Sequence, residues 1–190
     1  MIRPFQSVLA RLWSIALIVI GLLCVVVDET HADNVEQAEE YRAKTALIYS
    51  FAKFVTWPDA AFASDESSFI FGIMGGNPFG EALALLEDKR IHGRPIRIVE
   101  FDGPENFAPC QMLFCNIDCL NRFTEDYPQL LDSLNVLSVS EDEGFASQGG
   151  VLSLVLVDDH LGFEINATAA RNAQLELSSS LFKLAQSIFE

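Results

Sequence analysis

The side chains best suited to reactive chemistry are the cysteines Cys24, Cys110, Cys115 and Cys119. The last three are separated by four and then three residues, which is not the C-x2-C spacing of a zinc site or a redox pair. If QMLFC is a strand, Cys110 and Cys115 point to opposite faces and cannot share one ion. No metal site is therefore predicted, while a disulfide between Cys115 and Cys119, across the turn after this strand, stays open.

Other catalytic sets are sparse. Beyond the N-terminal leader described below, the only histidines are His92 and His160, both in expected turns, and no serine lies in a G-x-S-x-G motif. Adjacent acids such as Asp158 and Asp159 are more typical of solvated turns than of a general acid and base. The sequence therefore predicts a protein that is not an enzyme and holds no cofactor.

The glycine-rich stretch GIMGGNPFG, residues 72–80, lies between an apolar run and a helical pattern. α/β proteins bind phosphates at this kind of position. The stretch is neither G-x-G-x-x-G nor a P-loop, so it matches no nucleotide-binding motif. A tight strand-to-helix turn is the simpler interpretation, and the alternative is an anion held by the backbone amides of Phe79 and Gly80.

The stretch FEIN combines both kinds of side chain in one expected strand. Glu164 and Asn166 share one face, and Phe163 and Ile165 share the other. Polar side chains within a sheet need partners. Glu164 and Asn166 therefore line a pocket or an interface, or else they face solvent from an edge strand.

The stretch FAKFVTWP, residues 51–58, closes the first expected helix of the domain, which runs over residues 34–58. Pro58 ends that helix, because a residue before proline disfavours helical angles. Apolar residues at steps of three and four predict an inward stripe, made of Leu47, Ile48, Phe51, Phe54 and Val55. Lys53 and Trp57 lie towards the other side, with Tyr49, and are candidates for a binding surface.

The first residues form a leader. Arg3 and Arg11 precede an unbroken apolar run over residues 12–27, and Ala32 follows at a small-residue cleavage position. The run has 16 residues, and a membrane span needs about 20. We expect a signal peptide over residues 1–32, export to the periplasm, and a single domain over residues 33–190.

The expected domain is acidic, because the chain of 190 residues has a formal net charge of -15. Such a field repels nucleic-acid phosphates and anionic lipid headgroups, which argues against nucleic acid or direct membrane insertion after cleavage. Half of the residues are apolar, which is enough for a hydrophobic core.

Helical and strand patterns alternate along the domain. Apolar or alternating runs predict strands over residues 68–75, 93–101, 111–116 and 135–140, and a hairpin over 151–168. Helices are expected after Asn77, in part of 118–134, and in a closing segment with Leu181, Leu184, Ala185 and Ile188 inward. The fold class is therefore α/β: a layered sandwich with a mostly parallel central sheet, an antiparallel hairpin near the C-terminus and flanking helices.

Six stretches in order carry a resemblance to a known family. They are KTALIYSFAKFVTWP from Lys44, GGNPFG from Gly75, GRPI from Gly93, CQMLF from Cys110, VLSVSEDEGFASQGG from Val136 and FEINATAARNAQLELSSSLFKLA from Phe163. In order, spacing and residue type they resemble the YfiR-like family of small exported bacterial proteins. The resemblance covers about residues 42–186.

The resemblance implies regulation without catalysis. The best-understood members are periplasmic inhibitors that bind the sensor part of an inner-membrane diguanylate cyclase and hold it off. Loss of inhibition raises cyclic di-GMP, and adhesion and biofilm formation follow. The partner implied here is such a cyclase or a similar membrane sensor, and this hypothesis predicts a homodimer or a hetero-complex with an exposed apolar patch.

The cysteines depart from the family pattern. Relatives often carry a cysteine in the first core strand, as the natural partner of Cys110, where this chain has Gly72 or a neighbour. A second bridge near GFASQGG is also missing, so the redox control that the family suggests does not carry over directly. Two further hypotheses stay open: a periplasmic small-ligand module that uses the GGNPFG turn and the FEIN face, and a thiol-dependent redox protein.

Overall fold

The computed structural model describes residues 36–116, 135–158 and 160–190. The chain forms two compact units, residues 1–40 and 41–190. Residues 36–40 are the described part of the first unit and are helical, and all other described residues belong to the second unit. No helix in the described part is both long and apolar enough to cross a membrane.

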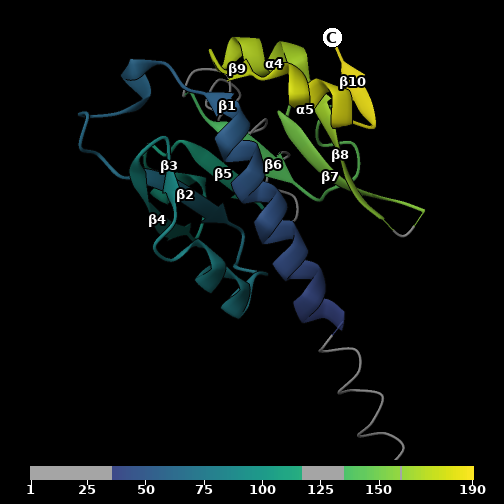
Figure 1. The fold of residues 1–190 in the computed structure, drawn as a ribbon, viewed down its shortest axis with the longest axis horizontal. Helices are drawn as coiled ribbons and strands as arrows, with labels where there is room; N and C mark the ends of the chain where they lie inside the picture. The colour runs from purple at the N-terminus through teal and green to yellow at the C-terminus, as the bar shows by residue number, and fades with distance from the viewer. Residues whose placement is uncertain (1–35, 117–134, 159) are drawn as a thin grey trace, which may run out of the picture. The chain divides into compact units, whose positions relative to one another are not determined.

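The second unit is built on a curled sheet with the strand order β10-β8-β7-β6-β5-β2-β4-β3 (Figure 1). Neighbouring strands from β4 through β2, β5 and β6 to β7 run parallel, and so do β8 and β10. The pairs β7–β8 and β3–β4 are antiparallel. The predicted fold class, mostly parallel with an antiparallel hairpin near the C-terminus, is confirmed.

The strand bounds follow the apolar runs closely in the middle of the chain. The sheet consists of β2 (Phe69–Met74), β3 (Arg90–Ile91), β4 (Arg94–Phe101), β5 (Met112–Cys115), β6 (Leu137–Ser140), β7 (Leu152–Val157), β8 (His160–Asn166) and β10 (Ser187–Phe189). A separate two-stranded sheet joins β1 (Val55–Thr56) to β9 (Glu176–Leu177). The sequence did not predict this second sheet.

The helices are few and mostly short. A long helix over residues 41–54 lies against the sheet, and α4 (Ala167–Asn172) and α5 (Ser179–Leu184) come near the C-terminus. The 3-10 helices are η1 (Asp59–Ala61), η2 (Gly80–Leu86) and η3 (Pro104–Asn106). The expected helix in 118–134 lies outside the described residues.

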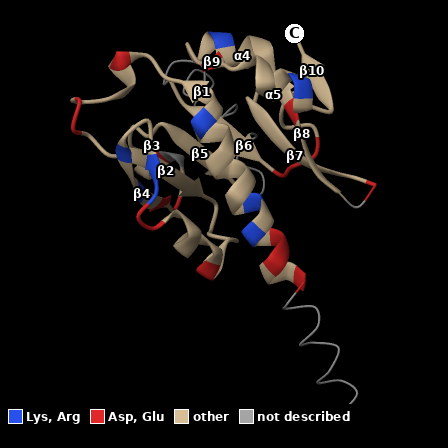
Figure 2. Cartoon of the chain, viewed as in Figure 1, with Lys and Arg blue, Asp and Glu red and all other residues tan. Residues whose placement is uncertain are grey.

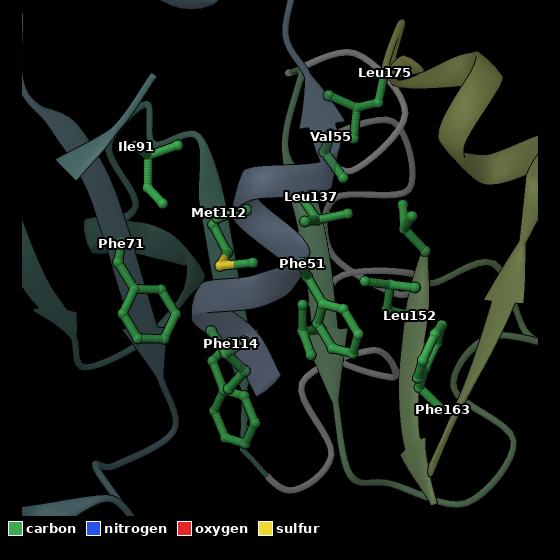
Figure 3. Packing of buried hydrophobic residues seen from close by; sticks show 14 of the residues in the cluster. Phe51, Val55, Phe71, Ile91, Met112, Phe114, Leu137, Leu152, Phe163 and Leu175 are labelled. Carbon is green, nitrogen blue, oxygen red and sulfur yellow. The ribbon is translucent and has the colours of Figure 1, made fainter. Parts of the chain in front are cut away.

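Alternation along the strands divides the core into two clusters, one on each face of the sheet. Met112 and Phe114 enter the first cluster, and Leu113 and Cys115 enter the second. The long helix covers the first cluster, where Phe51 lies edge-on to Phe163 with ring centroids 4.8 Å apart (Figure 3). The strands β2, β5 and β6 are therefore buried on both faces.

The long helix is rotated slightly from the predicted orientation. Its buried positions are Lys44, Thr45, Ile48, Phe51 and Ala52. Phe54, predicted to point inward, is 45% exposed. The side of the helix that carries Ile48 and Phe51 faces the core, and Phe54 lies at the border of that side. Apolar residues at steps of three and four do not by themselves show which of them lies at the border.

The predicted closing helix is wrong in its second half. The helix α5 ends at Leu184, Ala185 adopts an extended backbone, and β10 then pairs parallel with β8. Leu181 is buried as predicted, but Leu184 is 68% exposed and Ile188 is 45% exposed. The alternation of Ser187, Ile188 and Phe189 suits a strand. These residues form a strand rather than a helix because they pair with the free edge of β8.

Replacing Phe51 by alanine should destabilise the fold strongly, because its side chain is fully buried against Phe163. We expect a loss of about 3–5 kcal/mol in the free energy of unfolding for Phe51→Ala. The control Phe54→Ala should cost less than about 1 kcal/mol. Urea unfolding followed by circular dichroism measures both, and equal losses would contradict this helix orientation.

Candidate functional site

Trp57 is a core residue rather than part of a surface. It is buried, its indole Nε1–H donates to the backbone oxygen of Gln111 at 2.9 Å, and its ring lies edge-on to Phe69. The prediction that Trp57 is exposed is wrong because the helix ends at Phe54. The extended residues of β1 then turn the side chain inward, so its helical position no longer applies.

Lys53 is exposed, as predicted. Its Nζ lies 5.6 Å from the centre of the Tyr49 ring, and the Tyr49 hydroxyl donates to the backbone oxygen of Arg90 at 3.3 Å. Phe54 follows Lys53 on the same exposed turn. The end of the long helix therefore presents an exposed cation and an exposed aromatic ring at successive positions, which we call the Lys53–Phe54 surface.

Phe79 is also buried in the core. Its ring lies edge-on to the rings of Phe114 and Tyr41, with centroids 4.6 Å and 5.6 Å away. Its backbone N–H donates to the Asn77 side-chain oxygen at 2.9 Å. The turn thus satisfies this amide itself instead of offering it to an anion. The helix expected after Asn77 is the 3-10 helix η2, which begins at Gly80.

Asn166 has protein partners for both ends of its amide. Its oxygen accepts from the backbone N–H of Ala169 at 2.8 Å, which caps α4, and its nitrogen donates to the backbone oxygen of Ala146 at 2.7 Å. Its strand β8 lies between β7 and β10 and is not an edge strand. Glu164 is half-buried and stands between Ser153 of β7 and Ser187 of β10.

Three buried serines fasten the acidic turn at residues 141–150 to the sheet. The hydroxyl of Ser140 accepts from the backbone N–H of Asp142 and donates to the oxygen of Cys115. The hydroxyls of Ser138 and Ser153 accept from the backbone N–H groups of Val151 and Ala146. These bonds satisfy hydroxyls that would otherwise be costly to bury.

An ion pair joins this turn to the long helix, and sequence reasoning missed it. Lys44 is nearly buried and pairs with Glu141, whose other oxygen accepts from the Tyr41 hydroxyl at 3.0 Å. The Lys44 Nζ also lies 4.6 Å from the centre of the Tyr41 ring. The only signal in the sequence was a lysine near the inward stripe of the helix.

The cysteine geometry corrects one prediction. Cys110 and Cys115 do not face opposite sides of the sheet, because both enter the second core cluster. Cys110 precedes the first residue of β5, so strand alternation does not reach it. Burial raises the pKa of the Cys110 thiol to about 12, although a backbone hydrogen bond with Gly72 opposes this. At neutral pH this thiol is protonated and a poor nucleophile.

Two further predictions concern a disulfide and a metal site. Cys115 is buried, whereas Cys119 lies outside the described residues, so their disulfide stays a prediction. Over residues 36–116, 135–158 and 160–190, no three His, Cys, Asp or Glu side chains are grouped to hold a metal ion.

Gly72 is the residue that faces Cys110. A Cβ atom placed on Gly72 would lie 3.2 Å from the Cys110 sulfur. It would also lie 2.7 Å from Cε2 of the Phe101 ring, so that ring must shift to admit a side chain. A cysteine at position 72 would therefore place its Cβ atom next to the Cys110 sulfur.

A family model described as YfiR/HmsC-like matches residues 41–186 of the chain. No curated protein matches the chain. The match begins at the first residue of the second compact unit and ends four residues before Glu190, so it includes the long helix and nearly the whole sheet.

Two solved structures are similar at low identity. A conserved domain protein from Vibrio cholerae is 11% identical with a TM-score of 0.47, and the match covers 78% of this chain and 60% of that one. The ABC domain in complex with L-Trp from Streptococcus pneumonia is 12% identical with a TM-score of 0.41, covering 68% and 57%. This chain thus spans less than two thirds of either.

The substitution Gly72→Cys should create a disulfide with Cys110 under oxidising conditions. Closing a loop of this length stabilises by about 4 kcal/mol in the chain-entropy model, less the cost of moving Phe101. Peptide mapping by mass spectrometry should find the 72–110 bridge, and reduction should lower the melting temperature. Gly72→Ser is the control without a thiol, and a Cys110 that stays unbridged in the cysteine variant would contradict the geometry.

Proposed function

The chain belongs to the YfiR/HmsC-like family, and on that premise we propose that it is an exported, non-catalytic repressor of a membrane-bound diguanylate cyclase. It binds the periplasmic sensor part of the cyclase and lowers cyclic di-GMP. The observation that carries the proposal is the family match over residues 41–186. Membership in the family supports periplasmic regulation of cyclic di-GMP signalling. That the partner is a diguanylate cyclase is what our proposal adds.

Repression by binding requires a difference in affinity. The protein must bind the inactive cyclase more tightly than the active one, or it shifts no population. A hundredfold preference corresponds to about 2.8 kcal/mol. A few well-placed contacts supply this, so neither a cofactor nor a reaction is needed.

We assign the partner contact to the Lys53–Phe54 surface. Trp57 and Phe79 are buried and cannot touch a partner without unfolding their surroundings. Lys53 is exposed and Phe54 is 45% exposed, and aromatic side chains are enriched in protein interfaces relative to the rest of the surface. A positive group also suits contact from a chain that is otherwise strongly acidic.

The small-ligand alternative has less support from the contacts. The Phe79 amide and both ends of the Asn166 amide already have partners within the protein. Burial and the raised pKa of the Cys110 thiol oppose a redox role for that residue, and a redox role of Cys115 or Cys119 stays a prediction.

Deleting the gene in its native host should raise cellular cyclic di-GMP, and restoring the wild-type gene should lower it again. Restoration with Phe54→Ala or Lys53→Glu should leave cyclic di-GMP high, because the partner contact is weakened while the core is untouched. Mass spectrometry of nucleotide extracts measures the outcome, with periplasmic abundance and melting temperature checked for each variant.

Leu85→Ala and Arg171→Glu serve as matched controls, since both side chains are exposed on other elements. Both should repress as the wild type does. No rise in cyclic di-GMP on deletion, with the wild-type protein present in the periplasm, would refute the repressor function. A rise that every variant reverses would keep the function and remove the Lys53–Phe54 surface from it.

A further inference from the structure

The β3–β4 hairpin is a basic element in an acidic chain. Residues 89–97 contain Lys89, Arg90, Arg94 and Arg97 and no Asp or Glu, although the chain has a formal net charge of -15. Figure 2 shows how basic positions gather on β3 and β4. A positive charge cluster on such a chain attracts the anionic groups that most of the surface repels.

Arg94 differs from the other three cations of the hairpin, because contacts within the protein hold its side chain. Its guanidinium carbon lies 3.9 Å from the centre of the Phe62 ring. Its Nη1 donates to the backbone oxygens of Ser64 and Ser67 at 2.8 Å and 2.9 Å. Arg94 is half-buried, whereas the other three are exposed. Arg94 therefore anchors the neighbouring loop, and the other three cations face solvent.

The register of the hairpin places two of the exposed cations on one face of the sheet. Arg90 is aligned with Pro95, and Arg97 lies two residues further along β4, so both side chains are on the same face. This is the face of the second core cluster, because Val99, at the next alternate position, packs against that cluster. Both cations lie at the border of this face, since β3 is the last strand of the sheet.

The end of the long helix adds a fourth exposed cation. The Tyr49 hydroxyl donates to the backbone oxygen of Arg90 at 3.3 Å, and the Lys53 Nζ lies 5.6 Å from the centre of the Tyr49 ring. Tyr49 therefore joins the end of the helix to β3. We call the four exposed cations Lys53, Lys89, Arg90 and Arg97 the basic rim.

Protection of an open sheet edge does not account for the whole rim. Charged side chains on an edge strand prevent the addition of further strands. Arg97, however, belongs to β4, which lies between β2 and β3, and Lys53 belongs to a helix. The backbone oxygen of Arg90 on the edge strand already accepts from Tyr49. Two of the four cations thus stand where no edge needs them.

A single small anion does not fit the rim. Lys53 belongs to the helix that covers the first core cluster, whereas Arg97 lies on the opposite face of the sheet, so one phosphate or carboxylate cannot reach both. The pocket beside Tyr49 is apolar and has a volume of about 10 Å³, with Ile91 and Ile96 in its wall. That volume holds no more than a water-sized group.

We propose that the basic rim binds an acidic segment of the partner protein, next to the Lys53–Phe54 surface. Several carboxylates spread along one segment reach cations on both sides of the β3 edge, and most of the remaining surface repels the same carboxylates. The inference rests on the proposed function, because Lys53 belongs to both surfaces, and it adds the chemistry of the partner.

The test is retention of the exported chain on right-side-out membrane vesicles from the native host, prepared after deletion of the gene. Binding measured by pelleting should weaken at least about tenfold between about 0.05 M and about 0.5 M NaCl, because the Debye length falls from about 14 Å to about 4 Å. Lys89→Glu and Arg97→Glu should each weaken binding about threefold to tenfold at the lower salt concentration. Arg171→Glu reverses an exposed cation on α4 and should bind as the wild type does.

Two further samples distinguish a protein partner from lipid headgroups. Vesicles treated with protease, and protein-free vesicles made from the extracted lipids, should both retain little of the chain. Equal retention by the protein-free vesicles would assign the rim to lipid and overturn the proposal. Binding that ignores both rim substitutions, or no binding to any vesicle, would overturn it as well. Unchanged melting temperatures confirm that each variant is folded.

Failure of the proposed function gives a different result. If gene deletion leaves cyclic di-GMP unchanged while binding keeps its dependence on Lys89 and Arg97, the rim has an acidic membrane partner that is not the cyclase. If deletion raises cyclic di-GMP but binding ignores both substitutions, repression stands and the basic rim has no part in it.

Discussion

The arrangement of this fold depends on one constraint: the central strands β2, β5 and β6 are buried on both faces. Apolar side chains meet the constraint at most positions, but Ser138 and Ser140 of β6 and Ser153 of β7 do not. Their hydroxyls need partners inside the protein. The backbone of the acidic turn at 141–150 supplies most of them, so this turn must fold down against the sheet.

Once the turn is fixed, other features follow from it. Glu141 comes to lie against the long helix, where it pairs with Lys44 and accepts from Tyr41. Removing one partner of a nearly buried ion pair leaves a charge without compensation, so helix and turn depend on each other. Ala146, in the same turn, accepts from Asn166, which also caps α4. A chain of local contacts therefore runs from the first helix to the C-terminal part of the sheet.

The sequence predicted those elements whose burial determines their type. The apolar runs that became β2, β5 and β6 have no exposed face, and the β7–β8 hairpin joins two strands that are buried away from their turn. The same reasoning failed where a neighbour decides the structure. Trp57 turns inward because β1 interrupts the helix, and Ser187–Phe189 becomes a strand because β8 offers an unpaired edge. In both cases the cause lies in a strand pairing with residues far along the chain, which the local sequence does not reveal.

The candidate site residues divide along the same line. Asn166, Trp57 and Phe79 were chosen from their places in a strand, a helix and a glycine-rich turn, and all three make contacts within the protein. Candidates chosen from a local pattern can thus mark folding constraints rather than binding. The partner contact that we propose instead uses an ordinary residue that stays exposed, Phe54.

Exposed apolar residues are a liability unless association is controlled. A net charge of -15 makes two copies repel each other in most orientations, which suppresses unspecific contact. A surface overcomes this repulsion only if it lacks acids or carries a cation. The Lys53–Phe54 surface meets the second condition. The acidity of the chain therefore disfavours association with acidic partners except at a few surfaces.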